Sequence, residues 1–276
     1  MSSSSGPDLK KALEELFGVG KYVIGMVHLL PLPGSPKWTG DMAKVLERAV
    51  ADAGSLEAGG VDGLMVENFG DIPFRKGHVE AHTVSAMTLA VRAVRQAVGI
   101  PVGLNVLRND CKSAIAIASV TDCQFVRVNV HMGAMVTDQG IIEGEAYDTM
   151  RYRKELGVDV KVFADVLVKH ATPVGEQSLQ QAAKDTAYRG LADAIIVTGS
   201  GTGLPAEMED VVRAKEAVPD VPVLVGSGVD EGNAARVLSV ADGVIVGTSL
   251  KHGGIAANPV DQARVTALMA AVKGLR

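Results

Sequence analysis

Short apolar runs rich in β-branched residues alternate along the whole chain with longer stretches in which apolar residues recur at helical spacing. Such short runs are typical of buried strands, and the longer stretches are typical of amphipathic helices. The pattern predicts eight strands, at residues 22–27, 63–66, 102–106, 125–128, 160–164, 194–197, 221–225 and 243–246. It predicts helices at residues 42–58, 84–98, 112–119, 145–156, 178–189, 207–217, 232–239 and 259–272. The chain is therefore expected to be a series of βα units.

Capping and turn residues support these boundaries. Asp41 is placed to cap the first of these helices. Asn258-Pro259 is placed to open the last one, with proline at the first helical position. Gly59-Gly60 is expected to end a helix just before the next strand.

Eight consecutive βα units most simply close into a (β/α)8 barrel, because closure removes the strand edges that an open sheet must protect. The alternative is an open, doubly wound sheet, whose dinucleotide-binding form carries GxGxxG after its first strand. Residues 28–34 read HLLPLPG and lack that pattern. We therefore expect an α/β protein with one barrel domain over residues 19–276, preceded by an N-terminal tail and helix over residues 1–18. That helix is expected to pack across the bottom of the barrel or against its wall.

The composition is that of a soluble globular protein with a large core, since 47% of the 276 residues are hydrophobic and 21% are charged. A net charge of -5, the lack of a basic stretch and only 4% aromatic residues argue against a nucleic-acid-binding surface. No apolar run reaches the ~18 residues of a transmembrane segment, and the Ser-rich start has no signal-peptide core. The two cysteines have no metal-binding spacing, so we expect reduced thiols and a cytoplasmic location. Val- and Ala-rich helix faces are compatible with a homo-oligomer.

Polar residues gather in the loops that follow the predicted strands, whereas the loops that precede the strands read as plain connections. All strands of a barrel end on the same face, and chemistry occurs there. In chain order the polar residues are His28, Glu67, Asn68, Asn105, Arg108, Arg127, Asn129, His131, Asp165, Lys169, His170 and Thr198. This asymmetry predicts a functional site on that face.

Two glycine-containing turns follow the last two predicted strands. They consist of Gly226, Ser227 and Gly228, and of Gly247, Thr248 and Ser249. Glycine lets a backbone approach an anion closely, so that the N–H groups of the turn point at it, and phosphate sites of this fold are often built at this place. Tight βα turns also favour glycine, but two such turns favour binding of a small phosphorylated molecule. In residues 199–203, Gly201 and Gly203 either extend this anion site or belong to a mobile lid or solvated loop.

Titratable side chains at the strand ends are candidates for catalysis. His28, Glu67, Asp165 and His170 are predicted to meet at the barrel mouth as acid–base groups. A divalent metal held by two histidines and two carboxylates is the alternative, and no other cofactor follows from these motifs. Lys169 lies past the end of its strand, which favours charge stabilisation over imine chemistry.

Arg127 and Asn129 share one face of their strand by alternation. A charge on this otherwise apolar strand needs a partner, either Asp165 or Glu67, in a pair that is structural or part of the site. Asparagine amides at neighbouring strand ends offer neutral hydrogen bonds to a polar ligand. The predicted substrate-binding set is Asn68, Asn105, Arg127, Asn129 and Thr198. Residues 69–82 form a longer loop that either covers the site or is solvated.

Four segments resemble the BtpA/SgcQ family: residues 25–36 (GMVHLLPLPGSP), 63–71 (GLMVENFGD), 164–171 (ADVLVKHA) and 198–203 (TGSGTG). The resemblance covers nearly the whole chain after the N-terminal tail. It implies a barrel of the phosphate-binding type. The family's cyanobacterial namesake is associated with the accumulation of photosystem I reaction-centre proteins, and other members resemble products of sugar-utilisation operons.

Two kinds of function are therefore expected. The first is an enzyme acting on a small phosphorylated metabolite, a phosphosugar or nucleotide-like compound, by isomerase, lyase or hydrolase chemistry. The second, implied by the resemblance, is a non-catalytic assembly or stability factor in photosystem I biogenesis, with peripheral membrane association. The density of polar residues at the strand ends favours the enzyme, because a scaffold has no need of them.

Overall fold

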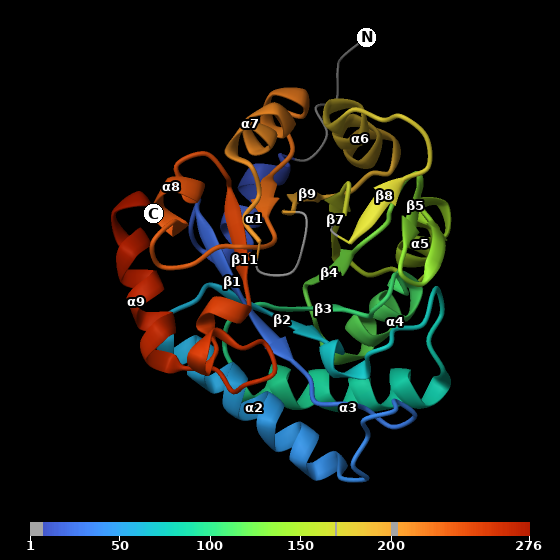
Figure 1. Cartoon of the computed structure of the whole chain (residues 1–276), viewed down its shortest axis with the longest axis vertical. Coiled ribbons are helices and arrows are strands. Elements are labelled where there is room, and N and C mark those ends of the chain that lie inside the picture. The colour runs from blue at the N-terminus through green and yellow to red at the C-terminus, as the bar shows by residue number, and fades with distance from the viewer. Residues whose placement is uncertain (1–7, 169, 200–203) are drawn as a thin grey trace.

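The computed structural model of the chain describes residues 8–168, 170–199 and 204–276. Eight parallel strands close into a barrel in the order β1-β11-β10-β9-β7-β4-β3-β2, and helices surround them (Figure 1). The strands are β1 (Tyr22–His28), β2 (Gly63–Glu67), β3 (Val102–Asn105), β4 (Phe125–Val128), β7 (Lys161–Val166), β9 (Ala194–Val197), β10 (Val223–Val225) and β11 (Gly243–Val246). The outer helices are α2 (Met42–Gly59), α3 (Ala81–Ala97), α4 (Cys111–Thr121), α5 (Ala146–Glu155), α6 (Leu179–Lys184), α7 (Met208–Ala217), α8 (Ala234–Leu238) and α9 (Gln262–Val272). The predicted (β/α)8 barrel is confirmed.

The barrel strands are buried on both faces, which is why they read as continuous apolar runs. Along β1, Tyr22, Ile24 and Met26 belong to the cluster inside the barrel. Val23 and Val27 belong to the larger cluster between the strands and the helices. Successive side chains of a strand point to opposite faces, so one strand supplies both layers of the core.

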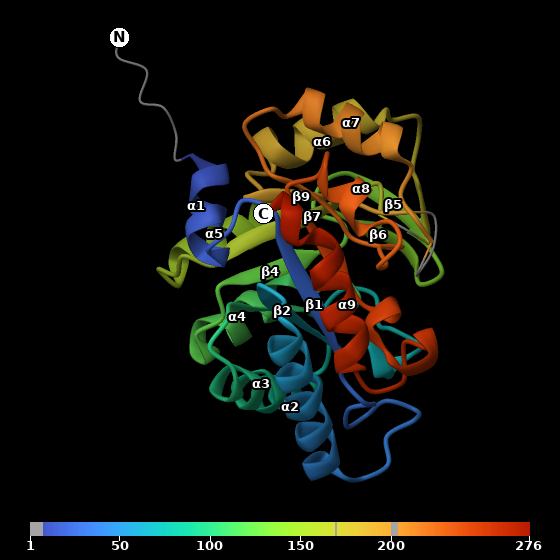
Figure 2. The ribbon, with the colours of Figure 1, turned by 90° about the vertical axis from the view of Figure 1, so that its left-hand side faces the viewer.

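Helix α1 (Leu9–Phe17) closes the amino-terminal end of the barrel. Leu13 and Phe17 join the inner cluster, and the Phe17 ring stacks on Tyr22 with centroids 4.3 Å apart. A Cβ at Gly63 would lie 2.7 Å from the Phe17 ring, so the helix approaches the strand where a side chain is absent. Figure 2 shows α1 at one end of the molecule and the β5–β6 hairpin towards the other. Of the two expected positions, the helix occupies the bottom of the barrel.

The predicted caps hold for α2 and fail for α9. The Asp41 carboxylate accepts a hydrogen bond from the backbone N–H of Lys44, and α2 ends at Gly60, which has φ +95°. Helix α9 begins only after Asp261, so Asn258-Pro259 does not open it. The chain stays extended there because Val260 forms a β-bridge with the strand-like segment at Lys251.

A small antiparallel sheet at the carboxyl end of the barrel was not predicted. It has the order β6-β5-β8 and consists of β5 (Ala134–Thr137), β6 (Gly140–Glu143) and β8 (Ala171–Pro173). Its strands are three or four residues long, and β8 pairs with a hairpin distant in the sequence, so local patterning carried little signal. The helix predicted at residues 178–189 is also divided, into α6 and a π-helix, η2 (Asp185–Arg189).

The structure bears on two expectations drawn from composition. None of the helices in the described part of the chain has the length and apolar character needed to cross a bilayer. Cys111 and Cys123 are free and buried. Burial raises the pKa of Cys111 to about 12 and that of Cys123 to about 11, so both are protonated thiols at neutral pH.

We predict that Phe17→Ala lowers the free energy of unfolding by about 3–5 kcal/mol, the usual cost of removing a buried phenylalanine ring. Phe17 is 7% exposed and contacts the rings of the barrel floor. Urea denaturation measures the loss. Leu89→Ala is the matched control, because Leu89 is 56% exposed and its truncation should change stability by about 0.5 kcal/mol or less. A loss below ~1 kcal/mol for Phe17→Ala would show that α1 contributes little to the core.

Candidate functional site

A cavity of about 390 Å³ opens at the carboxyl end of the barrel. The predicted site residues that line it are His28, Glu67, Arg127, Asn129, His170, Gly226, Ser227, Gly228, Gly247, Thr248 and Ser249. Asn68, Asn105, Asp165 and Thr198 lie outside its lining. Lys169, Gly201 and Gly203 lie outside the described residues. The structure thus brings the glycine turns and several acid–base candidates to the border of one cavity.

Residues 226–228 and 247–249 are the two turns predicted to bind an anion, and the first of these anion turns needs glycine for steric reasons. Gly228 has φ +68°, and a Cβ there would lie 2.2 Å from the backbone nitrogen of Pro205. A Cβ at Gly226 would lie 2.5 Å from Ile196. A side chain at either position would therefore displace the backbone or core that shapes the first turn.

The serine hydroxyls hold the anion turns in place. The backbone N–H of Gly199 donates to Ser227 Oγ at 2.7 Å, and Ser249 Oγ donates to the carbonyl of Val229 at 2.7 Å. Arg264 Nη1 donates to the Ser249 carbonyl at 3.2 Å, and its side chain lines the cavity. Arg264 was not predicted, because it lies on α9 and only the folded chain brings its positive charge beside the second turn.

A chain of buried hydrogen bonds connects Arg127 to Glu67, two residues of the cavity lining. Arg127 Nε and Nη2 donate to the two oxygens of Asp165, each at 2.9 Å. Asn129 Nδ2 donates to Asp165 Oδ2 at 3.0 Å. Asn105 Nδ2 donates to Asn129 Oδ1 at 3.3 Å and to Glu67 Oε2 at 2.8 Å. These contacts fix the orientation of each side chain by its neighbour.

Asp165 is the partner of Arg127, and its position differs from that expected of an acid–base group. Its side chain is fully buried, and both its oxygens accept hydrogen bonds from Arg127 or Asn129. Burial would lower the pKa of Arg127, but the charges of Asp165 and Glu67 outweigh it and raise the pKa. Arg127 is therefore cationic, and Glu67 is the carboxylate of this network that lines the cavity.

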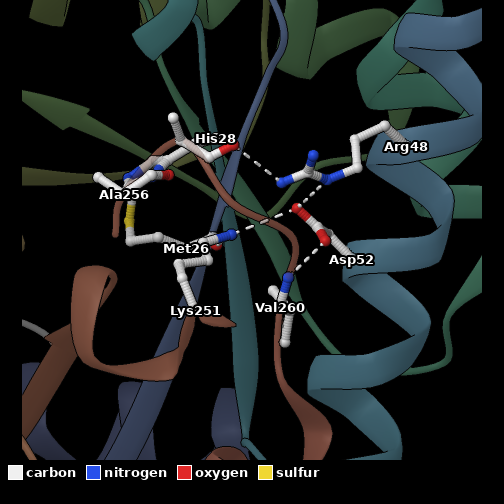
Figure 3. A network of polar contacts seen from close by, with 8 residues as sticks. Met26, His28, Arg48, Asp52, Lys251, Ala256 and Val260 are labelled. Carbon is white, nitrogen blue, oxygen red and sulfur yellow. Dashed lines mark hydrogen bonds and ion pairs between the residues drawn. The ribbon is translucent and has the colours of Figure 1, made fainter. Parts of the chain in front are cut away.

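The loop after the second anion turn is fixed by a buried ion-pair cluster (Figure 3). Lys251, fully buried, donates through Nζ to the Met26 carbonyl at 3.0 Å and to Asp52 Oδ2 at 3.3 Å. Asp52 Oδ1 accepts a hydrogen bond from Val260 N at 2.8 Å, and Arg48 Nε donates to Oδ2 at 3.1 Å. Burial lowers the pKa of Lys251, and the charge of Asp52 opposes this effect. Asp52 on α2 thereby holds both ends of the loop.

The same loop orients His28. His28 Nδ1 lies 3.2 Å from the carbonyl of Ala256, and because a carbonyl only accepts, Nδ1 must carry the proton. In the neutral ring the lone pair then belongs to Nε2. A Cβ at Gly247 would lie 3.5 Å from Nε2, which puts this atom next to the second anion turn.

Asn68 does not line the cavity and instead bonds to neighbouring loops. Its Oδ1 accepts from the Leu107 backbone N–H at 2.7 Å, and its Nδ2 donates to the Leu107 carbonyl at 3.3 Å and to Asp71 at 3.0 Å. The contact therefore joins the loops that follow β2 and β3. Arg75 and His78, from the loop after β2, also lie outside the lining.

Arg108 is a second cation in the lining that had no assigned role. It is 6% exposed, and its Nη1 lies 3.3 Å from Asp138 in the turn between β5 and β6. Burial lowers its pKa, and the charge of Asp138 opposes this effect. The unpredicted antiparallel sheet thus supplies an ion-pair partner at the edge of the cavity.

The alternative of a divalent metal held by His28, Glu67, Asp165 and His170 has no matching ligand group among the described residues. Within residues 8–168, 170–199 and 204–276, no three His, Cys, Asp or Glu side chains form a group that could hold a metal ion. Asp165 is directed at Arg127, while His28 is directed at Ala256. The described residues therefore do not form a two-histidine, two-carboxylate site.

We predict that Asp165→Asn lowers the free energy of unfolding by about 3–5 kcal/mol, because it leaves the buried Arg127 charge without a counter-ion. Chemical denaturation measures the loss. Glu15→Gln is the control, since the Lys11–Glu15 pair is 71% exposed on both sides and should contribute less than ~1 kcal/mol. Equal stability of the two variants would mean that the Arg127–Asp165 pair does not hold the barrel mouth.

We further predict that Asp52→Asn releases the loop of residues 251–260 and disturbs His28. Histidine ¹⁵N NMR should show the Nδ1–H tautomer in the wild type and a mixture in the variant, since the Ala256 carbonyl no longer stays in place. Asp261→Asn is the control: it alters the α9 cap at the end of the same loop and should leave the tautomer unchanged. An unchanged tautomer in a folded Asp52→Asn variant would contradict the prediction.

Comparison with known proteins identifies relatives over the full barrel. Residues 19–274 match the model of the BtpA family. The photosystem I biogenesis protein BtpA of Synechocystis is 51% identical over 265 residues, which cover 96% of this chain and 92% of that protein. The putative sgc region protein SgcQ of Escherichia coli is 33% identical, covering 96% of this chain and 98% of that protein.

Solved structures with little sequence similarity share the fold. A tryptophan synthase chain from M. tuberculosis has a TM-score of 0.61 and 18% identity, covering 97% of this chain and 99% of that one. Phosphoribosyl anthranilate isomerase from Thermus thermophilus has a TM-score of 0.56 and 13% identity, covering 92% and 100%. The architecture is thus common to several barrels, whereas the sequence match over residues 19–274 shows that the chain belongs to the BtpA family.

Proposed function

We propose that this protein is an enzyme acting on a small phosphorylated metabolite. The observation that carries the proposal is that the two anion turns border the same cavity as Glu67 and His28. In a glycine-containing turn the backbone N–H groups can approach a phosphate closely and donate hydrogen bonds to it. A carboxylate beside an oriented imidazole is suited to proton transfer. Phosphoribosyl anthranilate isomerase, which shares the fold, has a phosphorylated compound in its name and supports this choice.

The lining residues have distinct roles in this proposal. The phosphate binds at residues 226–228 and 247–249, where the positive charge of Arg264 adds attraction. Glu67 and His28 Nε2 transfer protons, and Arg127 with Asn129 orients polar groups of the substrate. Asn105 acts through Glu67, which it holds by a hydrogen bond. Proton transfer by Glu67 and His28 to and from atoms of the substrate is compatible with isomerase, lyase or hydrolase chemistry.

A second function rests on the relative from Synechocystis. That protein, 51% identical, is named a photosystem I biogenesis protein. By this analogy the chain would be an assembly or stability factor for a membrane protein complex, with the barrel as a scaffold at the membrane surface. A ligand-sized cavity bordered by Glu67, His28 and Arg127 favours the enzyme, since docking to a partner does not require it.

We predict that inorganic phosphate or a phosphate ester raises the thermal stability of the protein, and that Gly247→Ala weakens this effect. A ligand at 100 times its Kd adds about 2.7 kcal/mol. A Cβ at Gly247 would crowd His28 and Met26 at 3.3 Å, within the anion turn. Differential scanning fluorimetry against phosphate, sulfate, phosphosugars and nucleotides, with and without divalent metal, measures the response.

Gly232→Ala is the matched control, because a Cβ there meets only an ordinary contact of 3.5 Å to Asp230. It should respond to phosphate like the wild type. A protein that no phosphorylated compound stabilises would not be the proposed enzyme. Capture of a photosystem complex by the wild type and by Gly247→Ala alike would then support the assembly factor.

A further inference from the structure

Two of the phenylalanines lie outside the hydrophobic core. The chain has five phenylalanines, and three of them, Phe17, Phe125 and Phe163, pack together in the floor of the barrel. The other two, Phe69 and Phe74, both lie between β2 and α3, and both line the cavity while remaining partly exposed. With so few aromatic residues, their placement at the mouth needs a reason other than packing.

The turn that carries Phe69 is firmly fastened. The Gly70 backbone N–H donates to the Leu29 carbonyl at 3.2 Å, and a Cβ at Gly70 would lie 2.5 Å from the nitrogen of Pro31. Asp71 Oδ1 accepts a hydrogen bond from Leu32 N at 2.8 Å. Contacts on both sides of the turn therefore hold Phe69 in one place.

The segment that carries Phe74 is fastened to the neighbouring loop. The Arg108 backbone N–H donates to the carbonyl of Arg75 at 3.1 Å, and Leu107, next to Arg108, also lines the cavity. Phe69 stacks on His28 with centroids 4.5 Å apart and planes 21° apart. Phe74 has no aromatic partner among the described residues.

Phe69, Phe74 and Leu107 line the cavity together, and we call them the aromatic wall. Leu107 lies across the mouth from the first anion turn, whereas Phe69 stacks on His28 and lies nearer the second. In the closed order of the barrel, β3 and β10 are four strands apart in either direction, so the loops after them face each other. Leu107 follows β3, and residues 226–228 follow β10. A ligand held by its phosphate at the anion turns would pass Glu67 and reach this wall.

We propose that the aromatic wall is a second subsite, which binds a planar aromatic or heteroaromatic ring of a phosphate ester. The inference rests on the proposed phosphate site and specifies its substrate class. A rigid phenylalanine surface gains from a flat ring by burying apolar area and by stacking, and it gains little from a hydroxylated sugar. The substrate then has a phosphate at one end, a ring at the other, and the reacting bonds between them beside Glu67 and His28.

The test compares matched ligands by isothermal titration calorimetry on the full chain. AMP, UMP and phenyl phosphate carry a ring, whereas ribose 5-phosphate and inorganic phosphate do not. At least one ring-bearing compound should bind about tenfold or more tightly than ribose 5-phosphate, in the range that stacking on an aromatic side chain provides. Phe74→Ala should abolish that preference and leave the affinity for inorganic phosphate unchanged.

Two further variants separate the effect of the Phe74 ring from that of apolar area and from that of aromatic residues elsewhere. Phe74→Leu retains an apolar side chain without a ring, and it should also lose most of the preference. Tyr147→Ala removes an aromatic side chain that is 69% exposed and belongs to α5, so it should retain the preference. Equal binding of ring-bearing and ring-free phosphates, or an undiminished preference in Phe74→Ala, would overturn this inference and leave the phosphate site intact. Failure of every phosphate to bind would overturn the proposed function and the ring subsite together.

Discussion

The buried ion pair between Arg127 and Asp165 is the constraint on which the carboxyl end of the barrel depends. Two charges removed from water are tolerated only if each is fully hydrogen-bonded. Both Asp165 oxygens are occupied, and Asn129 and Asn105 extend the bonding to Glu67. The pair therefore determines the orientation of the Asn129 and Asn105 amides and, through them, the position of the Glu67 carboxylate at the cavity.

The two ends of the barrel are built from different interactions. The floor is apolar and aromatic: Phe17 from α1 fits where Gly63 leaves room, and its ring stacks on Tyr22. The strand ends at the mouth carry charged and amide side chains, which bond to one another between neighbouring strands from Arg127 to Glu67. Apolar packing at the floor stabilises the barrel and leaves the residues at the mouth available for function. The mouth can therefore contain buried charges, which cost free energy when they are removed from water.

The loops around the mouth are held by contacts from outside the cavity. Asn68 joins the loops after β2 and β3, and Asp52 of α2 holds the loop that ends in the bridge at Val260. Asn68 follows a strand and Asp52 lies on a helix, and both are buried polar residues. Their positions in the sequence pattern therefore do not show that they hold loops. Asp52 holds the loop whose Ala256 carbonyl contacts His28. Asn68 bonds to Leu107 of the cavity lining and to Asp71 in the turn after Phe69. Both therefore support residues of the cavity from outside it.

The sequence by itself determined the series of βα units, the closed barrel and the two glycine turns, because hydrophobic period and glycine stereochemistry act over a few residues. It also narrowed the partner of Arg127 to two carboxylates. Only the tertiary structure decided that Asp165 is that partner, that Asn68 bonds to Leu107, and that Arg264 reaches the second turn. It also decided that the β5–β8 pairing exists and that α9 starts after Asp261. These outcomes depend on contacts between residues tens to hundreds of positions apart, whose geometry no local pattern encodes.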